Sequence, residues 1–493
     1  MASPSGLCRA LTFIDSWLEY RNRQVDLPGF AVAIHHGEDT RFSRAYGVAD
    51  VEFQEPMTVA HRLAVGSQSK MFTATALLRL AERGMLSLDD RVVTHLPWLA
   101  GHADARFASV TLRQLLTHGG GVIRDGQDAD HWQLTQPFPD SDAFHGAVLA
   151  AGLVIDGYTK LKYSNVGYAL LGEVIEAVSG KAYADQVAES VIVPAGMDAI
   201  LDSEVARARP VARGYTRRID RRRLPVAREV VTRAFAPSAG WYSTVDDMCR
   251  FVSGLLSRAD GVLGAAAKHE MRRSRRGHWV PAHQRGSEYG LGMEIHRFGG
   301  RVLLGHGGSI TGFRSCTFGD PGDGLVVAVM ANAKDAPTMQ MLGGIFEVID
   351  FFQEHASKPA TGKLSAGPMR FVGLASTIEL VAAGQRVVAI DPDQWFPFHD
   401  ADELLPLTDT TFRIDRASDL AATGETAELL VDGAEATAMT FGGSTMWRED
   451  AYLAWLASRD EVVDSPSPRS TRTEVVLRGI PEATRRGDQG PPL

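Results

Sequence analysis

The chain of 493 residues contains little cysteine and no long apolar stretch. Its three cysteines are Cys8, Cys249 and Cys316, and their spacing fits neither a disulfide framework nor a zinc site. We therefore expect free, buried thiols, as is typical of a reducing compartment. No run of about 18 apolar residues occurs, so we expect no segment that spans a membrane.

The N-terminus lacks the features of a secretory signal peptide. Arg9, Asp15 and Glu19 interrupt the apolar part of MASPSGLCRALTFIDSWLEYRNR, and no small-residue cleavage site follows it. The same segment fits an amphipathic helix. The sequence therefore predicts a cytoplasmic protein.

The sequence also lacks the motifs of several functional classes. The 51 basic and 60 acidic residues give a net charge of −9, with no basic stripe of the kind that binds nucleic acid. No His-Glu-x-x-His or Cys-x-x-Cys motif occurs, so we expect no metal and no other cofactor. HGGG at 118–121 is typical of an esterase oxyanion loop, but the Gly-x-Ser-x-Gly elbow of an α/β-hydrolase is absent. The arginine-rich run 217–228 fits a solvated loop better than a contact with a phosphate-bearing partner.

Residues 1–356 carry an alternating pattern of strands and helices. Two β-rich runs, 30–35 and 41–48, flank a glycine-containing turn and predict a hairpin. Apolar residues at helical spacing predict helices over 70–83, ended by Gly84, and over 166–178, ended by Gly180. Further strands are expected at 291–295, 301–304, 313–318 and 325–330, with a helix at 338–353.

The composition changes after residue 356. Residues 357–369, SKPATGKLSAGPM, have the composition of a linker. Short strand-like runs then predict a small all-β domain over 370–479: RVVAI, TFRI, AELLVD, ATAMTF and TEVVLR. The last residues, 480–493, have the composition of a disordered tail.

Ser67 and Lys70 form the first candidate for a catalytic pair. Of the eight lysines, Lys70 alone has a serine three residues upstream. In a helix, positions i and i+3 share one face, so both side chains would point into the same space. A buried lysine with a lowered pKa can take the proton that makes a serine hydroxyl nucleophilic. The alternative is that Ser67 caps the helix and Lys70 is solvated.

A second candidate segment, KLKYSNVGYALLGEVIEAVSG at 160–180, places Tyr163 and Asn165 just before a helix. A tyrosine beside a lysine can relay protons, and an asparagine amide can orient a neighbouring group or a substrate amide. The alternative is that Tyr163 packs in the core and Asn165 caps the helix.

A third segment, LLGHGGSITGFRSCTFG at 303–319, carries His306 at the end of a strand-like run. Gly307 and Gly308 would let a substrate backbone approach closely. The backbone N–H of Ser309 could then face an oxyanion together with the N–H of Ser67. The alternative is a turn between strands with an exposed histidine.

Together, Ser-x-x-Lys, Tyr-x-Asn and His-Gly-Gly, in this order, resemble the penicillin-binding-protein and class C β-lactamase group of serine hydrolases. The resemblance covers about residues 10–355 and includes PGFAVAI, YGVAD, LSLDDRVVTHLPWL, TLRQLLTHGGG, PSAGWYSTVDDMCRFVSGLL and YGLGMEI. It implies an α/β (α+β) β-lactamase/transpeptidase-like catalytic domain, in which helices flank an antiparallel sheet and a helical insertion is present.

The resemblance also implies a role for each residue. Ser67 would be the acylated nucleophile, and Lys70 would activate it. Tyr163 would pass a proton to the leaving group and later help to activate the incoming nucleophile. Asn165 would position Lys70 or the substrate amide. His306 would stand where many β-lactamases have the lysine of a Lys-Thr-Gly triplet, and members with His-x-Gly include D,D-peptidases, D-aminopeptidases and some esterases.

We therefore predict that Ser67 cleaves an amide or ester in a small molecule or peptide, with a D-configured residue at the acyl position. The alternatives are acyl transfer to an amine or alcohol, as in cyclases that release a nonribosomal peptide from a carrier protein, a broad esterase, and a non-catalytic scaffold. The C-terminal domain resembles the lipocalin-like or barrel domains of D-aminopeptidase-like members, mainly through ATAMTFGGSTMWR at 436–448. We expect that domain to border the active site, with Trp447 and Arg448 as contacts.

Overall fold

A computed structural model describes residues 4–227, 230–273, 287–355, 367–383, 386–418, 422–433 and 435–457. The chain forms two compact units, one spanning Asn22–Ile345 and the other made of Ala2–Arg21 and Phe346–Leu493. The boundary therefore falls inside helix α11 (Thr338–Glu354), whereas the sequence placed it in the linker at 357–369. Most of helix α1 (Pro4–Gln24) also belongs to the second unit rather than to the catalytic domain expected over 1–356.

The first unit is built on an antiparallel sheet of eight strands in the order β3-β2-β1-β11-β10-β9-β8-β7. Its strands are β1 (Gly29–His36), β2 (Asp39–Asp50), β3 (Glu55–Pro56), β7 (Ser287–Tyr289), β8 (Glu294–Phe298), β9 (Arg301–Ile310), β10 (Phe313–Gly319) and β11 (Leu325–Ala331). The central strands β1 and β11 are apolar along almost their whole length and buried on both faces. This burial requires cover on each side of the sheet.

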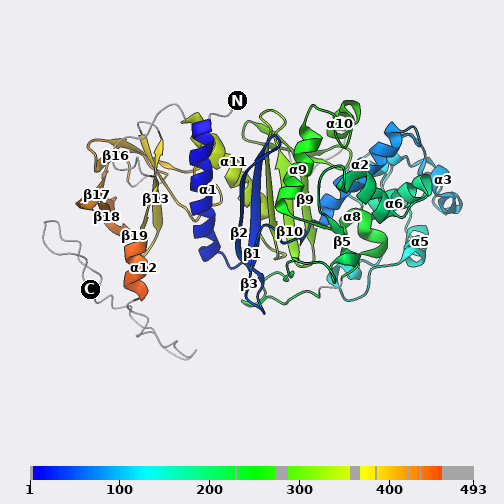
Figure 1. The fold of residues 1–493 in the computed structure, drawn as a ribbon, viewed down its shortest axis with the longest axis horizontal. Coiled ribbons are helices and arrows are strands. Elements are labelled where there is room, and N and C mark those ends of the chain that lie inside the picture. The colour runs from blue at the N-terminus through cyan, green and yellow to red at the C-terminus, as the bar shows by residue number, and fades with distance from the viewer. Residues whose placement is uncertain are drawn as a thin grey trace. The chain divides into compact units, whose positions relative to one another are not determined.

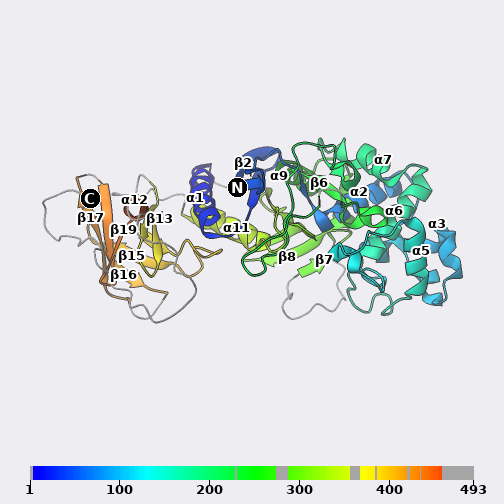
Figure 2. The same ribbon diagram turned by 90° about the horizontal axis from the view of Figure 1, so that it is seen from below.

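Helices supply much of that cover. Helix α9 (Val245–Leu256) packs on β1, β10 and β11, while α2 (Ser69–Glu82), α6 (Asn165–Ser179) and α8 (Ala236–Ala239) pack on one another. The ring of Phe72 on α2 meets those of Phe251 and Trp241, with centroids 4.9 and 5.9 Å away. Helices α2, α3, α5 and α6 lie together to one side of the sheet in both views (Figures 1 and 2).

The remaining elements of the first unit are short. A small sheet joins β4 (Leu63–Ala64), β6 (Trp241–Ser243) and β5 (Ile200–Leu201). The other helices are α3 (Val92–His95), α4 (Leu112–Leu116), α5 (Ser141–Ala150), α7 (Tyr183–Val187) and α10 (Ala265–Arg272). Three of these helices, α3, α4 and α5, lie in sequence between Lys70 and Tyr163.

The predicted hairpin and the two long helices are confirmed. Helix α2 ends at Glu82, and Gly84 follows with a φ of 68°. Helix α6 ends before Gly180, which has a φ of 70°. Its N-cap is Ser164, whose Oγ accepts a hydrogen bond from the N–H of Gly167 at 2.8 Å, so Asn165 is not the cap.

Strand β9 is longer than the sequence suggested. Residues 301–304 were expected to be the strand, with His306 at its end, yet β9 continues to Ile310. The turn considered as the alternative for this segment is therefore wrong. Gly308 lies where the chain itself packs tightly, because a Cβ there would be 2.0 Å from the Val65 carbonyl oxygen. The strand predicted at 291–295 begins only at Glu294.

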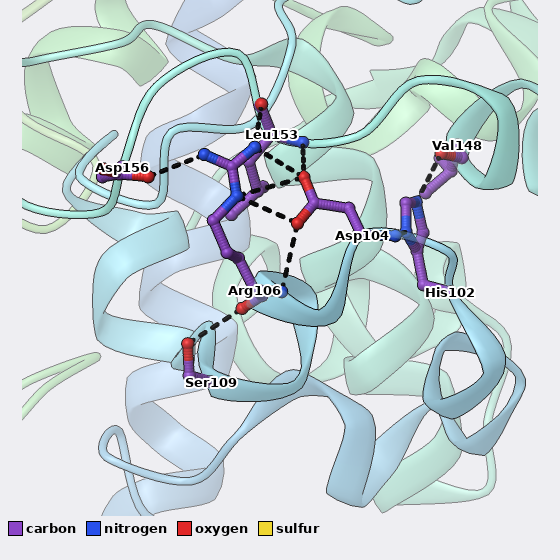
Figure 3. A network of polar contacts seen from close by, with 7 residues as sticks. All are labelled: His102, Asp104, Arg106, Ser109, Val148, Leu153 and Asp156. Atoms are coloured by element: carbon purple, nitrogen blue, oxygen red, sulfur yellow. Dashed lines mark hydrogen bonds and ion pairs between the residues drawn. The ribbon is translucent and has the colours of Figure 1, made fainter.

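A polar network ties two loops of the helical insertion together (Figure 3). Arg106 donates to the carboxylates of Asp104 and Asp156 and to the carbonyl of Leu153, at 2.6 Å each. The Leu153 N–H donates back to Asp104 at 2.9 Å. Hydrogen bonds from Arg106 hold the pKa of Asp104 well below its usual range. The network fixes the loop that leads into Tyr163.

The second unit is a closed barrel with α1 packed on it. Its elements are β12 (Met369–Val372), β13 (Thr377–Ala383), β14 (Arg386–Ile390), β15 (Asp402–Pro406), β16 (Thr411–Arg416), β17 (Thr426–Asp432), β18 (Glu435–Phe441), β19 (Ser444–Arg448) and α12 (Glu449–Ala457). Pairing of β12 with β19 closes the barrel. The predicted C-terminal all-β domain is thus confirmed. TEVVLR, the tail at 480–493 and most of the expected linker lie outside the described residues.

Three expectations from the sequence, on membrane spans, metal sites and cysteines, can be compared with the described residues. None of the helices there is long and apolar enough to cross a membrane. Nor does that part of the chain bring together three metal-ligating side chains. All three cysteines are free, and Cys249 and Cys316 are buried as expected, but Cys8 is exposed on α1.

Candidate active site

Ser67 stands at the turn that leads into α2. It lies in the short 3-10 helix Gly66–Gln68, immediately before the first residue of α2. From residue 63 to residue 78, Ser67 is the only residue that is not buried. Its hydroxyl is therefore accessible while its surroundings are dry, as a nucleophile that must meet a substrate requires.

Lys70 lies one turn further on and is completely buried. Its Nζ is 3.4 Å from Ser67 Oγ, 2.7 Å from Asn165 Oδ1 and 2.9 Å from the carbonyl oxygen of Ser238. Burial lowers the pKa of Lys70 well below its ordinary value, and the nearby charge of Asp125 partly opposes that effect. Burial thus favours the neutral amine, the form that can accept a proton.

The partners of Lys70 decide which way its lone pair points. A neutral amine has two N–H groups and one lone pair. Asn165 Oδ1 and the Ser238 carbonyl can only accept, so they take the two N–H groups. The lone pair is left for the hydroxyl of Ser67. The arrangement suits a base that removes the serine proton.

Asp125 fixes the orientation of Asn165. The Asn165 Nδ2 donates to Asp125 Oδ1 at 2.6 Å, and Trp132 Nε1 donates to the same oxygen at 2.9 Å. Because a carboxylate only accepts, the amide nitrogen of Asn165 must face Asp125, and its oxygen must face Lys70. Nothing in the sequence singled out Asp125, since its connection to Lys70 passes through a residue 40 positions away.

Tyr163 is a second side chain in contact with Ser67. Its side chain is hydrogen-bonded to Ser67, and burial raises its pKa above the ordinary value. Lys70 Nζ lies 4.8 Å from the centre of the Tyr163 ring. The ring of His118 packs 4.2 Å away. His118 belongs to the HGGG run, and its burial lowers its pKa, so it supports Tyr163 as a neutral aromatic ring.

Strand β9 approaches the nucleophile turn at Ser309. Gly66 has a φ of 55°, and a Cβ on it would lie 2.8 Å from the backbone nitrogen of Ser309. The backbone nitrogens of Ser67 and Ser309 therefore belong to segments in direct contact. Gly307 differs from Gly308, because a Cβ on Gly307 would meet nothing closer than 3.9 Å. A side chain at position 307 would therefore have room, whereas one at position 308 would not.

His306 is engaged by the protein itself. It is buried, its Nε2 lies 2.9 Å from the Tyr289 hydroxyl, and its Nδ1 lies 2.5 Å from the carbonyl oxygen of Gly307. Burial lowers its pKa, and the neighbouring carboxylate of Glu294 acts in the opposite direction. The ring links β9 to Tyr289, and its Nδ1 also lies 3.4 Å from Glu294 Oε1.

Trp447 and Arg448 lie on β19 of the barrel, in the second unit. The Trp447 ring stacks on Tyr452 at 6.4 Å, and Arg448 Nε is 3.8 Å from Asp450. Both contacts join β19 to helix α12 within the second unit, and a role in substrate binding stays a prediction. Ser67, Lys70, Tyr163 and Asn165, by contrast, come together around one hydroxyl.

Comparisons with known proteins identify the family of the chain. A family model described as Beta-lactamase matches residues 14–343. The chain belongs to the Beta-lactamase family. Penicillin-binding protein 4 from Amycolatopsis lactamdurans is 29% identical over 321 residues, which are 62% of this chain and 81% of that protein. Protein flp from Staphylococcus aureus (strain NCTC 8325 / PS 47) is 26% identical over 184 residues, so the chain spans only 36% of that relative's length.

Solved structures of other proteins share the fold. A penicillin-binding protein homologue from Pyrococcus abyssi, described as octameric, matches with a TM-score of 0.60 and 22% identity, over 88% of this chain and 99% of that one. A D-stereospecific amidohydrolase from Streptomyces sp. matches with a TM-score of 0.58 and 24% identity, over 67% of this chain and 96% of that one. At such identities the likeness concerns the fold alone.

Proposed function

We propose that this member of the Beta-lactamase family is a serine hydrolase that forms an acyl-enzyme at Ser67 and cleaves an amide or ester. The observation that carries the proposal is the hydrogen bonding of Lys70. Two pure acceptors occupy its N–H groups, so its lone pair is free for the Ser67 proton.

The chemistry follows from the contacts around Ser67. Lys70 takes the hydroxyl proton while Oγ attacks the substrate carbonyl. The N–H groups of Ser67 and Ser309 would stabilise the oxyanion that develops. Tyr163, kept protonated by its raised pKa, gives its proton to the leaving group, and the proton held by Lys70 restores the phenol. Water then attacks the ester by the same steps in reverse.

The proposed substrate is a peptide or small molecule with a D-configured acyl residue. The name of the Streptomyces D-stereospecific amidohydrolase, which has the same fold, supports this class. Release of the acyl group to an amine or alcohol would use the same acyl-enzyme, so the experiment must distinguish the two acceptors.

The test is to trap the acyl group. The wild type and Ser67→Ala are incubated with the amide and the methyl ester of D-phenylalanine and of L-phenylalanine, and the intact masses are measured. We expect an added phenylalanyl mass on the wild type with the D substrates, and none on Ser67→Ala. Unchanged turnover by Ser67→Ala would remove the proposed mechanism. A product that forms only when an external amine is added would establish acyl transfer instead of hydrolysis.

A further inference from the structure

The arginine-rich run forms a tight hairpin over residues 216–225, which we call the arginine hairpin. Ile219 and Arg222 exchange two backbone hydrogen bonds of 2.9 Å each. Asp220 and Arg221 form the turn between them, with φ values of 46° and 61°. Two consecutive residues with positive φ are typical of a two-residue hairpin turn, which fixes the geometry of both arms.

Two arginines fasten the hairpin to the body of the first unit. Arg223 Nη2 donates to the carbonyl oxygen of Asp26 at 2.8 Å, and Arg223 also forms an ion pair with Asp335. Arg218 Nη1 donates to Asp26 Oδ2 at 2.6 Å, and the backbone N–H of Arg218 donates to Asp335 Oδ2 at 3.1 Å. The hairpin is thus held through one of its faces.

The opposite face of the hairpin is uncovered. Side chains alternate along each arm, so the neighbours of Arg218 and Arg223 face away from the anchoring contacts. These neighbours are all exposed: Arg217, Ile219, Arg222 and Leu224. Ile219 is 59% exposed and Leu224 is 66% exposed. Within the described residues, no side-chain hydrogen bond or ion pair engages Arg217 or Arg222. The outward face therefore combines free positive charge with uncovered apolar side chains.

Arg221 adds a third exposed guanidinium at the tip of the hairpin. Its φ of 61° lies in the region that glycine adopts with less strain. Backbone strain of this kind is found where a segment serves binding. Asp220 is the single carboxylate of the turn, so positive charge still predominates on the exposed part of the hairpin.

The base of the hairpin is joined to the strand that approaches the nucleophile. The N–H of Tyr215 donates to the carbonyl of Gly312 at 3.1 Å, and a Cβ on Gly214 would lie 2.5 Å from the Phe313 ring. Gly312 lies between β9 and β10, and β9 carries Ser309, whose nitrogen approaches the turn that bears the nucleophile. A molecule held by the hairpin would therefore lie beside the segment that forms the active site.

We propose that the arginine hairpin docks an acidic protein, and that the acyl group accepted by Ser67 is attached to that protein. The inference rests on the proposed acyl-enzyme chemistry and specifies how the substrate is presented. In the transfer, Ser67 Oγ bonds to the acyl carbon while its proton passes to Lys70. The bond from that carbon to the partner's oxygen or nitrogen breaks, and the departing atom takes the proton of Tyr163.

Charge and apolarity together favour a protein as the partner. Arginine beside exposed apolar side chains is typical of protein–protein interfaces. Carboxylates interspersed with apolar side chains would complement the outward face. A nucleic acid backbone offers no apolar contact to Ile219 and Leu224. The net charge of −9 also opposes the approach of this chain to a polyanion.

The experiment uses two peptides that differ only in charge. Each consists of an amphipathic helix and a flexible tail of glycine and serine, and each ends in a serine whose hydroxyl is esterified with D-phenylalanine. The polar positions of the helix are glutamate in one peptide and glutamine in the other. We measure kcat/KM for the release of phenylalanine, with D-phenylalanine methyl ester as the substrate that carries no partner.

At low ionic strength, we expect the wild type to prefer the glutamate peptide over the glutamine peptide by about 10- to 100-fold, the combined effect of three exposed ion pairs. The preference should fall as salt is added. It should be lost in the hairpin variant, which combines Arg217→Gln, Arg221→Gln and Arg222→Gln. A second variant, Ile219→Ser with Leu224→Ser, should lower kcat/KM for both peptides by about 10-fold. Both variants should cleave the methyl ester at the wild-type rate.

A matched control removes the same number of exposed arginines elsewhere, through Arg83→Gln, Arg258→Gln and Arg297→Gln. It should keep the wild-type preference. Equal kcat/KM for the two peptides in the wild type, or a preference that survives in the hairpin variant, would overturn the inference. Self-association of the wild type that the hairpin variant lacks would assign the outward face to a second copy of the chain and also overturn it. Hairpin-dependent binding of a single-stranded oligonucleotide or of phosphatidylglycerol vesicles, without discrimination between the peptides, would do the same.

Failure of the proposed function gives a different result, because neither the methyl ester nor the peptides would be cleaved. The acyl part of the inference then falls with that function. The docking part is decided by the fluorescence anisotropy of labelled peptides titrated with Ser67→Ala. Tighter binding of the glutamate peptide that is lost when the three hairpin substitutions are added supports docking, and equal binding of both peptides contradicts it.

Discussion

At the scale of single residues, the protonation of Lys70 is set by its surroundings rather than by its own chemistry. Burial disfavours the ammonium, the charge of Asp125 favours it, and burial is the larger effect. A base must be neutral to accept the Ser67 proton. The value of kcat/KM should therefore fall as the pH drops through the lowered pKa of Lys70.

We predict that Asp125→Asn moves this acid limb to lower pH. Removal of the negative charge takes away a group that raises the pKa of Lys70, so the amine stays neutral in more acidic solution. The plateau rate should also fall, because Asn165 loses the carboxylate that orients its amide. The measurement is kcat/KM against pH for the wild type and the variant.

Asp128→Asn is the matched control for this experiment. Asp128 is exposed on the same loop, and its charge does not contribute to the pKa shift of Lys70. Its profile should overlay that of the wild type. An acid limb that stays in place in Asp125→Asn would show that a group other than Lys70 controls the rate.

A second prediction concerns Tyr163. Its pKa is raised, so the phenol stays protonated through neutral pH and can supply the proton that a leaving group needs. Tyr163→Phe should reduce kcat/KM for an amide by about 100- to 10,000-fold, the usual range for general acid–base catalysis. A matched nitrophenyl ester, whose leaving group needs little protonation, should lose much less. Equal losses on both substrates would assign Tyr163 a positioning role only.

Short spacings in the sequence predicted the four residues that the structure brings together around the Ser67 hydroxyl. Ser67 and Lys70 share one helical turn, and Tyr163 and Asn165 flank the start of a helix, so local patterns could propose them. Asp125 comes from a loop 40 residues before Asn165, and no local pattern marks it. Its contact with Asn165 depends on side-chain packing, which a single sequence does not contain.

At the scale of elements, the close approach of β9 to the nucleophile turn determines the geometry of the site. Gly66 has positive φ, and its missing side chain lets the Ser309 nitrogen come near. We predict that Gly66→Ala reduces kcat by about 100- to 1,000-fold, the effect of losing one oxyanion donor. The added methyl group would displace Ser309 from its position beside Ser67.

Gly84→Ala separates this steric effect from the cost of a left-handed backbone. Gly84 has a similar φ of 68°, but a Cβ on it would meet nothing within 4 Å. Both variants should therefore lose about 1 to 2 kcal/mol of stability from backbone strain. Only Gly66→Ala should lose activity per folded molecule, measured as kcat after the folded fraction has been determined by circular dichroism. A kcat for Gly66→Ala equal to that of Gly84→Ala would contradict the predicted oxyanion geometry.

Periodicity predicted most of the elements but failed where glycine has a packing role. Helices α2 and α6 carry strong apolar periodicity and end at glycines with positive φ, so their bounds followed from the sequence. In β9 the strand was predicted to end at residue 304, and a turn at Gly307 and Gly308 was left open as the alternative. A Cβ at Gly305 would lie 1.9 Å from the Thr317 carbonyl oxygen, so glycine is needed there inside a paired strand. Such a demand comes from the neighbouring strand and is invisible in β9 alone.

At the scale of the whole molecule, the order of the chain does not match the order of its units. The second unit combines the first helix with the C-terminal barrel. Within it, Trp17 Nε1 donates to the carbonyl of Pro392 at 3.1 Å, and Phe13 meets Phe398 at 5.4 Å between ring centroids. The amphipathic pattern of residues 4–24 predicted a helix correctly. It could not tell which apolar surface, separated by more than 300 residues, would cover that helix.

This arrangement makes the first helix a test of the barrel. Trp17 is fully buried and also packs edge-on against Trp395, with centroids 6.0 Å apart. We predict that Trp17→Ala destabilises the second unit by about 3 to 5 kcal/mol, the usual cost of truncating a buried large aromatic side chain. Calorimetry should show one thermal transition shifted to lower temperature. The thermal transition of the first unit, which is identified because the acylation burst at Ser67 is lost over the same temperatures, should keep its position.

Phe107→Ala, at a buried ring of the first unit that stacks on His102, should produce the reverse pattern. If Trp17→Ala instead lowered both transition temperatures equally, the two units would unfold together. The two compact units would then not be independent units of unfolding.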